Sequence, residues 1–312
     1  RLIRRQRQMC IRDRIKSTYI CKEPAMRLTP PSGITVRKLK IKTTTNTMPA
    51  LALYPETYSE TASQPTQSSG VLWIHGGGYI CGMKEMVFMS RAVDLVRKYG
   101  AVVVSPGYRL AFRKPYPAAL EDCYAALVYM KEHAEELGIC KNQIFVGGES
   151  AGGGLAAAVC MAARDRGTIN IAYQMPLYPM LDDRDTPSSA NNHGRIWNTR
   201  KNHKAWRMYL KGLGRKPGDS SVPVYAAPAR QTDYSGLPPA YTFVGDGEPF
   251  YAETLDYIAN LKRCGIQAEA DVYHCDMHAF DMMRPEWELS CEAAQRFNEH
   301  FKYAMKNYYA KN

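Results

Sequence analysis

The alternation of short apolar runs with longer amphipathic stretches constrains the fold of this chain most. Eight runs rich in β-branched and aromatic residues predict strands at Ile34–Ile41, Ala50–Tyr54, Val71–Ile74, Ala101–Ser105, Gln143–Gly147, Ile171–Leu177, Tyr241–Gly245 and Ala268–Tyr273. Apolar residues at helical spacing predict helices between them, at Lys84–Tyr99, Ala118–Leu137, Ala151–Arg166, Ala252–Cys264 and Pro285–Lys306. We therefore expect an α/β fold, with an eight-stranded, mostly parallel sheet flanked by helices.

One interval interrupts this rhythm. Residues 182–236 are polar and rich in proline, asparagine and arginine, with one helix expected around His203–Leu210. The interval is too long for an ordinary connection, so it predicts a lid or cap inserted in a single domain that spans residues 31–312. The first two strands are expected to form an antiparallel hairpin through Thr43–Asn46.

The net charge of +11 is concentrated at the N-terminus. Residues 1–16 carry seven basic side chains and one acid, while the rest of the chain has no comparable basic run. Such an arm could bind phosphates, but we favour a disordered or non-native leader, or a partial N-terminal cap, over residues 1–30. We therefore expect no nucleic-acid partner, and deletion of residues 1–16 would test this.

The nine cysteines are scattered, and none forms a C-x-x-C pair or a zinc-binding pattern. This distribution favours a reducing cytoplasm over a disulfide-rich exterior, and it predicts no metal site. The longest apolar run, Leu155 to Ala163, is too short to span a bilayer, so no membrane span is expected. The oligomeric state is left open, and a homo-oligomer is one alternative.

A glycine-rich segment follows one of the predicted strands. The strand Ile144–Gly147 leads into Gly148-Glu149-Ser150-Ala151-Gly152 and then into an alanine-rich helix. This strand–turn–helix context is the one that the G-x-S-x-G motif of a serine nucleophile requires. The alternative is an ordinary glycine turn with a serine that caps the helix, and the motif alone does not exclude it.

A second glycine motif, His75-Gly76-Gly77-Gly78, directly follows the strand Val71–Ile74. Acyl transfer needs hydrogen-bond donors where negative charge develops, and bare glycine backbone can approach that point. The alternative is a flexible turn in which His75 orders the loop. Together, and in this order along the chain, the two motifs predict a serine hydrolase far more specifically than either does alone.

With both motifs, the chain resembles the hormone-sensitive-lipase-like esterases of the α/β-hydrolase fold. The resemblance extends from about Ile34 and includes Tyr108-Arg109-Leu110-Ala111, Pro117–Asp122, Leu181-Asp182-Asp183 and Leu237–Ala240. It implies that the backbone N–H groups of Gly77, Gly78 and Ala151 form the oxyanion hole. The chain departs from the family pattern at Phe112, where proline is usual, and at Cys275, where glycine is usual.

The general base and its acid should follow Ser150 in the order acid, then histidine. His278 follows the last predicted strand and matches the family's H-A-F signature, with His274 as the alternative. Two carboxylates, Asp246 and Glu248, follow the seventh strand. The family usually has aspartate at the position before Pro249, so we favour Glu248 and keep Asp246 as the alternative.

These residues predict a serine carboxylic-ester hydrolase that acts on small esters through an acyl-enzyme, without a cofactor. Short acyl chains are implied by the resemblance alone. The alternatives are an acyltransferase or a deacetylase of sugars or metabolites with the same triad, and a non-catalytic ligand-binding member of the fold. The retention of all three candidate triad residues argues against the last of these.

Overall fold

The computed structural model describes residues 28–56 and 68–310. In that part of the chain eight strands form one sheet: β1 (Ile34–Lys42), β2 (Thr47–Pro55), β3 (Ser68–Ile74), β4 (Val102–Pro106), β5 (Ile139–Glu149), β6 (Tyr173–Leu177), β7 (Ala240–Gly245) and β8 (Ala268–Tyr273). The order across the sheet is β1-β2-β4-β3-β5-β6-β7-β8. The first two strands form the expected antiparallel hairpin, β2 also pairs antiparallel with β4, and the remaining neighbours pair in parallel. The expected eight-stranded, mostly parallel sheet is confirmed.

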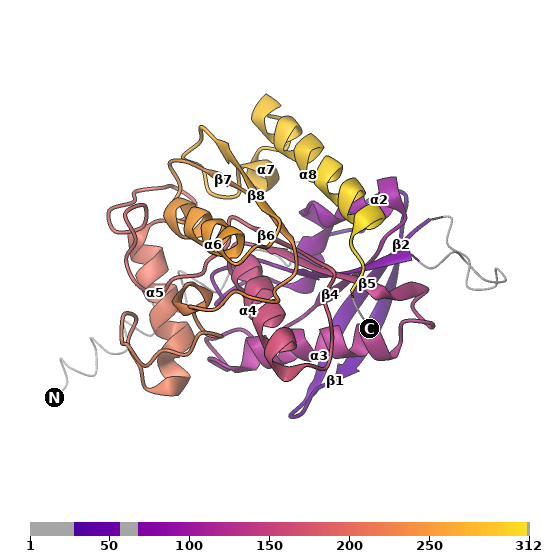
Figure 1. Cartoon of the computed structure of the whole chain (residues 1–312), viewed down its shortest axis with the longest axis horizontal. Coiled ribbons are helices and arrows are strands. Elements are labelled where there is room, and N and C mark those ends of the chain that lie inside the picture. The colour runs from indigo at the N-terminus through magenta and orange to yellow at the C-terminus, as the bar shows by residue number, and fades with distance from the viewer. Residues whose placement is uncertain (1–27, 57–67, 311–312) are drawn as a thin grey trace, which may run out of the picture.

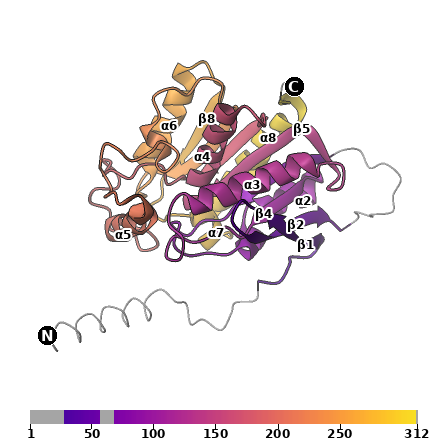
Figure 2. The ribbon, with the colours of Figure 1, turned by 90° about the horizontal axis from the view of Figure 1, so that it is seen from below.

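Helices cover both faces of the sheet (Figures 1 and 2). The helices α3 (Ala118–Glu132), α4 (Ala151–Arg166) and α6 (Tyr251–Arg263) pack on one face, and α2 (Ala92–Tyr99) and α8 (Glu288–Asn307) pack on the other. Each face has its own apolar core. The inner strands are buried on both sides, as β4 and β6 show along their whole lengths, which explains why their sequences are mainly apolar and do not alternate with charged residues.

Two predicted helices differ most from the observed ones. The stretch Lys84–Tyr99 is divided into a 3₁₀ helix, η1 (Lys84–Met89), and α2. The division falls at Ser90, whose hydroxyl donates to the carbonyl of Val87 and accepts from the N–H of Ala92. The predicted helix Ala118–Leu137 ends at Glu132, where the ring Nδ1 of His133 lies 3.1 Å from the carbonyl of Tyr129. At Ser90 a local side-chain bond competes with the helical pattern.

The segment between β6 and β7 contains α5 (Thr199–Leu210) and the short 3₁₀ turns η2 (Lys211–Leu213) and η3 (Pro228–Arg230). The helix α5 includes the one expected around His203–Leu210, and Asn198 caps it by accepting from the N–H of Lys201. Figure 1 shows α5 at one end of the molecule, beyond the ends of the central strands. The assignment of residues 182–236 as a lid stays a prediction.

The leader predicted over residues 1–30 lies almost entirely outside the described residues, as does most of the loop between β2 and β3. Among the described helices, none combines the length and apolarity that a bilayer crossing requires. The seven cysteines in the described ranges are all free thiols.

Candidate active site

The predicted site residues lie in the loops that follow the carboxyl ends of four strands. The glycine loop follows β3, Ser150 follows β5, Glu248 follows β7, and His278 lies in the loop after β8. Because β3, β5, β7 and β8 belong to the parallel part of the sheet, the loops at their carboxyl ends lie on the same side. The fold therefore brings together residues that lie more than 200 positions apart in the sequence.

Ser150 occupies a sharp turn between β5 and α4. Its backbone φ of 56° lies in the left-handed region, which is strained for a residue with a side chain. The flanking glycines explain how the turn packs: a Cβ on Gly148 would lie 2.4 Å from the carbonyl oxygen of Ile74, and a Cβ on Gly152 would lie 2.0 Å from it. The absence of side chains at both positions lets the turn lie directly against the end of β3.

The side chains of Ser150, His278 and Glu248 form a continuous hydrogen-bonded series. Ser150 Oγ lies 2.9 Å from His278 Nε2, and His278 Nδ1 bonds to Glu248 Oε2. The other oxygen of Glu248 accepts from the N–H of Gly245 at 3.0 Å. An ionised carboxylate can only accept, so Nδ1 carries the imidazole proton and Nε2 is free to accept from the Ser150 hydroxyl. All three residues are buried, and Glu248 is fully inaccessible.

The two alternative residues form a pair of their own. Asp246 Oδ2 lies 2.8 Å from His274 Nδ1, and the His274 side chain is fully exposed. This hydrogen bond lowers the pKa of Asp246 and raises the pKa of His274. Asp246 also accepts from the N–H of Cys275, where the chain departs from the family pattern. Neither alternative residue contacts Ser150 or His278 in the described hydrogen bonds.

Two aromatic rings hold the imidazole of His278. Tyr178, from the end of β6, and Phe250, two residues after Glu248, both meet it edge to face, with centroids 5.2 and 5.0 Å away. Edge-to-face packing fixes the plane of a ring without supplying a competing hydrogen bond. Of the two, Phe250 belongs to the Pro-[LF] pattern in the sequence, whereas no sequence signal identified Tyr178.

The glycine loop after β3 forms a tight turn. Gly77 and Gly78 have φ values of 116° and 58°, and the N–H groups of Ile80 and Cys81 both donate to the carbonyl of Gly77. Positive φ values favour glycine, and neither position has room for a side chain: a Cβ on Gly77 would lie 2.1 Å from the carbonyl oxygen of Cys81, and one on Gly78 would lie 2.2 Å from Trp197 Cη2. Ala151 begins α4, and an N–H in the first turn of a helix has no acceptor within that helix. These are the three donors that the family resemblance implies.

His75 is buried beneath this loop. Its ring stacks on Tyr108 with centroids 4.2 Å apart, and its Nδ1 lies 2.8 Å from the carbonyl of Gly76. The Tyr108 hydroxyl donates to the His75 carbonyl at 3.0 Å. Burial lowers the pKa of His75 to about 4, so the ring is neutral at pH 7. These contacts agree with a loop-ordering role.

A buried acidic pair behind the triad was not found from the sequence. Glu149 accepts from the indole N–H of Trp73 at 2.8 Å, and burial, with Asp281 nearby, raises its pKa to about 8. Asp281 accepts from the Tyr178 hydroxyl at 2.9 Å and lies 3.3 Å from Arg91 Nε. Burial raises the pKa of Asp281 as well. The network links α2 to the ring that packs on His278.

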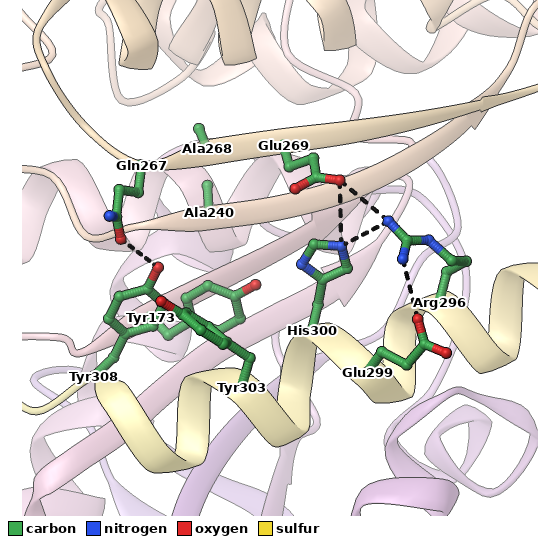
Figure 3. A pocket seen from close by; sticks show the side chains of 10 residues that line it. All are labelled: Tyr173, Ala240, Gln267, Ala268, Glu269, Arg296, Glu299, His300, Tyr303 and Tyr308. Carbon is green, nitrogen blue, oxygen red and sulfur yellow. Dashed lines mark hydrogen bonds and ion pairs between the residues drawn. The ribbon is translucent and has the colours of Figure 1, made fainter.

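A separate cavity of about 480 Å³ lies at the other end of the strands, against α8 (Figure 3). Tyr173, Ala240 and Ala268 line it from the starts of β6, β7 and β8. Its charged groups pair with one another, as Arg296 does with Glu269 and Glu299. Within residues 28–56 and 68–310, no three histidine, cysteine or acidic side chains lie together as a metal site would need.

A family profile described as the alpha/beta hydrolase fold matches residues 71–282. Among curated proteins, the chain is 32% identical over 231 residues to Esterase LipI of Mycobacterium tuberculosis, which covers 73% of this chain and 69% of that protein. It is 34% identical over 204 residues to Carboxylesterase NlhH of the same species, which covers 64% of this chain and 62% of that protein. The chain thus spans somewhat under two thirds of the length of NlhH.

Solved structures give the same result. A bacterial heroin esterase superposes with a TM-score of 0.78 at 33% identity, over 88% of this chain and 83% of that chain. An esterase of the archaeon Pyrobaculum calidifontis superposes with a TM-score of 0.75 at 30% identity, over 86% of this chain and 83% of that chain. The family profile, the relatives and the eight-stranded sheet agree with one another. The chain therefore belongs to the α/β-hydrolase family, in its hormone-sensitive-lipase-like branch of serine carboxylesterases.

Proposed function

We propose that this protein hydrolyses small carboxylic esters, with Ser150 as the nucleophile, His278 as the general base and Glu248 as the acid that orients His278. The observation that carries the proposal is the unbroken series of hydrogen bonds from the Ser150 hydroxyl through both nitrogens of His278 to Glu248. The series is buried and lies beside the glycine loop. Such a constellation is recognised by the geometry and roles of its members.

In the first half of the reaction, Ser150 Oγ attacks the ester carbonyl while His278 Nε2 takes its proton. The carbonyl oxygen becomes an oxyanion, which the N–H groups of Gly77, Gly78 and Ala151 stabilise. Glu248 stabilises the imidazolium that forms. His278 then returns the proton to the leaving alcohol, and the acyl group remains on Ser150.

In the second half, His278 takes a proton from water, and the resulting nucleophile attacks the acyl-enzyme. A second oxyanion forms in the same place and collapses: the bond between the acyl carbon and Ser150 Oγ breaks, His278 returns its proton to Oγ, and the acid is released. The relatives named as esterases and a carboxylesterase support hydrolysis as the reaction, and the family resemblance supports short acyl chains.

The hydrolysis of p-nitrophenyl acetate by single variants tests the triad. We expect Ser150→Ala and His278→Gln to lower kcat/KM by about 10⁴-fold or more, and Glu248→Gln by about 10³-fold or more. Full activity in Ser150→Ala would refute the proposed function. A pre-steady-state burst of p-nitrophenol, equal in amount to the enzyme, would report the acyl-enzyme.

The exposed pair supplies matched controls, because Asp246→Asn and His274→Gln make the same kinds of chemical change nearby. We expect both controls to keep kcat/KM within about threefold of the parent, as surface substitutions usually do. A collapse with Asp246→Asn, but not with Glu248→Gln, would reverse the assignment of the acid. Adding alcohol acceptors to the assay separates a hydrolase from an acyltransferase, because only the latter would direct most of the acyl group to the alcohol.

A further inference from the structure

Four residues where β6 ends, 177–180, hold the backbone of Ser150 from both sides. The N–H of Ser150 donates to the carbonyl of Leu177 at 3.0 Å, and the carbonyl of Ser150 accepts from the N–H of Met180 at 3.0 Å. The carbonyl of Met180 in turn accepts from the hydroxyl of Tyr79, which directly follows the glycine loop, at 2.7 Å. This junction therefore contacts both the nucleophile and the end of the loop beside it.

Tyr178 lies within this junction and packs on the base. Its ring meets the imidazole of His278 edge to face, with centroids 5.2 Å apart. The backbone φ of Tyr178 is 33°, which is strained for a residue with a side chain, and its N–H donates to the carbonyl of Phe243 at 3.1 Å. A strained conformation persists only where the surrounding structure holds it, so the direction of this ring is set by its neighbours.

The hydroxyl of Tyr178 is held by a residue close to His278 in the sequence. Asp281 lies in the short helix α7 (Phe280–Met283), three positions after His278. Its Oδ1 accepts from the Tyr178 hydroxyl at 2.9 Å, and its Oδ2 lies 3.3 Å from Arg91 Nε. Burial raises the pKa of Tyr178, so the hydroxyl keeps the proton that it donates. The bond thus connects the junction that holds Ser150 to the segment that carries His278.

From these contacts we infer that Tyr178 and Asp281 are positioning residues that set the distance between His278 Nε2 and Ser150 Oγ. The inference rests on the proposed function and deepens it. The same junction holds the Ser150 backbone and directs the Tyr178 ring, so both partners of the proton transfer are placed against one support. Without the bond to Asp281, the segment that carries His278 shifts relative to Ser150. Proton transfer requires the two atoms to lie within about 2.6–3.2 Å of each other.

The leaving alcohol determines how strongly a displaced base lowers the rate. As the tetrahedral intermediate collapses, the bond between carbon and the alcohol oxygen breaks, the electron pair stays on that oxygen, and His278 Nε2 gives it a proton. p-Nitrophenolate is stable as an anion and leaves without this proton, whereas ethoxide does not. Hydrolysis of ethyl acetate therefore needs His278 as base and as acid during acylation, and hydrolysis of p-nitrophenyl acetate needs it there mainly as base.

The test measures kcat/KM for these two acetate esters in Tyr178→Phe, Asp281→Ala and the double variant. We expect Tyr178→Phe to lower the value for ethyl acetate about 30-fold or more, and the value for p-nitrophenyl acetate only about threefold. Asp281→Ala should give the same pattern, because it removes the acceptor of the same bond. The double variant should lose no more than the more impaired single variant, since the effects of residues that act through one bond do not add.

Tyr257→Phe is the matched control, because the hydroxyl of Tyr257 also donates within the core, to Gln174 Oε1 at 2.7 Å, and its ring packs on Tyr234. We expect a similar loss of stability in urea and an unchanged ratio between the two esters. A Tyr178→Phe variant with the ratio of the parent, or a double variant in which the two losses multiply, would overturn the inference. Full hydrolysis by Ser150→Ala would instead overturn the proposed function, so the two failures are distinguishable.

Discussion

Gly152 illustrates how a residue without a side chain shapes the turn that holds Ser150. Its missing Cβ would lie 2.0 Å from the carbonyl oxygen of Ile74 and 2.5 Å from that of His75. Both obstacles are backbone atoms that cannot rotate away. A methyl group here must therefore push α4 away from the end of β3.

We expect Gly152→Ala to lower the free energy of unfolding by about 3 kcal/mol, the upper part of the usual range for overpacking. A shift of about 1 Å between Ser150 and the glycine loop should also lower kcat/KM about 100-fold.

Gly167→Ala, at the other end of α4, is the matched control, because nothing lies within 4 Å of its Cβ position and only its φ of 63° opposes alanine. We expect a cost of about 1–2 kcal/mol there and full activity. Equal stability and activity in the two variants, measured by urea unfolding and p-nitrophenyl acetate hydrolysis, would contradict the packing argument.

Because of His75, the free energy of unfolding is expected to depend on pH. Its pKa is about 4 in the folded protein because of burial, against about 6.5 in an unfolded chain. Below pH 6.5 the unfolded chain binds a proton that the folded protein excludes, so this residue stabilises the fold above pH 6.5 and the contribution is lost as the pH falls toward 4. The loss approaches about 1.4 kcal/mol per pH unit within that window.

We therefore expect His75→Gln to be less sensitive to acid than the parent, whatever its absolute stability. Urea unfolding at pH 7 and pH 5 measures this difference. The exposed His274 serves as the control, because its pKa is raised and not lowered, and His274→Gln should not reduce the acid sensitivity. An equal loss of stability between the two pH values in the parent and in His75→Gln would show that burial of the His75 ring does not control it.

The sequence identified the candidate acids and bases, but the choice among them depends on side-chain direction. Asp246 and Glu248 are two positions apart in one loop, and His274 and His278 are four apart in another. Gly245 and Gly247 let the loop after β7 pack on residues 275 and 276, which aligns the loops so that Glu248 turns inward and Asp246 outward. Spacing in sequence does not reveal this alignment. The family pattern at Pro249 favoured the residue that the structure pairs with His278.

At the level of elements, the motif Tyr108-Arg109-Leu110-Ala111 connects the glycine loop to α3. Ala111 donates its N–H to the carbonyl of Tyr79, and Tyr108 stacks on His75. Arg109 makes two side-chain bonds of 2.8 Å to Asp122, and its backbone N–H makes a third contact. Asp122 is fully buried and lies in the Pro117–Asp122 stretch that also carries the family resemblance. Two sequence motifs therefore form one contact.

We expect Arg109→Met to lower the free energy of unfolding by about 3 kcal/mol, because it leaves the Asp122 carboxylate buried without a counter-charge. Adding Asp122→Asn should restore part of the loss, since a neutral amide needs no ion partner. Lys98→Met, which removes an exposed ion pair with Asp94, should cost less than about 1 kcal/mol. Chemical denaturation of the parent, the two single variants and the double variant measures these differences in the free energy of unfolding. A double variant no more stable than Arg109→Met would argue against an unpaired charge as the cause.

The types of the secondary-structure elements could be predicted because their apolar patterns extend over many residues. The residues at which several helices begin or end could not be predicted. The sequence predicted one helix over Lys84–Tyr99, and Ser90 divides it through two bonds of its hydroxyl. Tyr178 and Trp197 could not be assigned roles from the sequence, because each reaches the site from a segment with no local motif. Their positions follow from long-range packing against His278 and Gly78. The cytoplasmic location and the absence of a nucleic-acid partner stay predictions, and the oligomeric state stays open.

At the scale of the whole molecule, the segment between β6 and β7 is joined to the acid loop. Ser188 donates to the carbonyl of Pro249, and Asn192 donates to the carbonyl of Gly247, so the segment holds both neighbours of Glu248. The segment is itself closed by Asp183, a fully buried carboxylate that accepts from Arg230 and from the N–H of Gly218. Residues near its two ends are thus held together by one side chain.

Arg230→Met should therefore loosen this segment and, through it, the loop that carries Glu248. We expect limited trypsin digestion to cut within residues 182–236 at least about tenfold faster than in the parent, because cleavage follows the population of locally opened protein. The kcat/KM for p-nitrophenyl acetate should fall in parallel, since Glu248 would orient His278 less well. Arg184→Met is the matched control, because Arg184 is half-exposed and its partner Asp182 is only two residues away, so the pair does not join the two ends of the segment. Mass spectrometry of the early fragments identifies the cleavage sites. Equal cleavage rates in the two variants would mean that Asp183 does not close the segment, whereas faster cleavage with full activity would mean that the segment and the acid loop move independently.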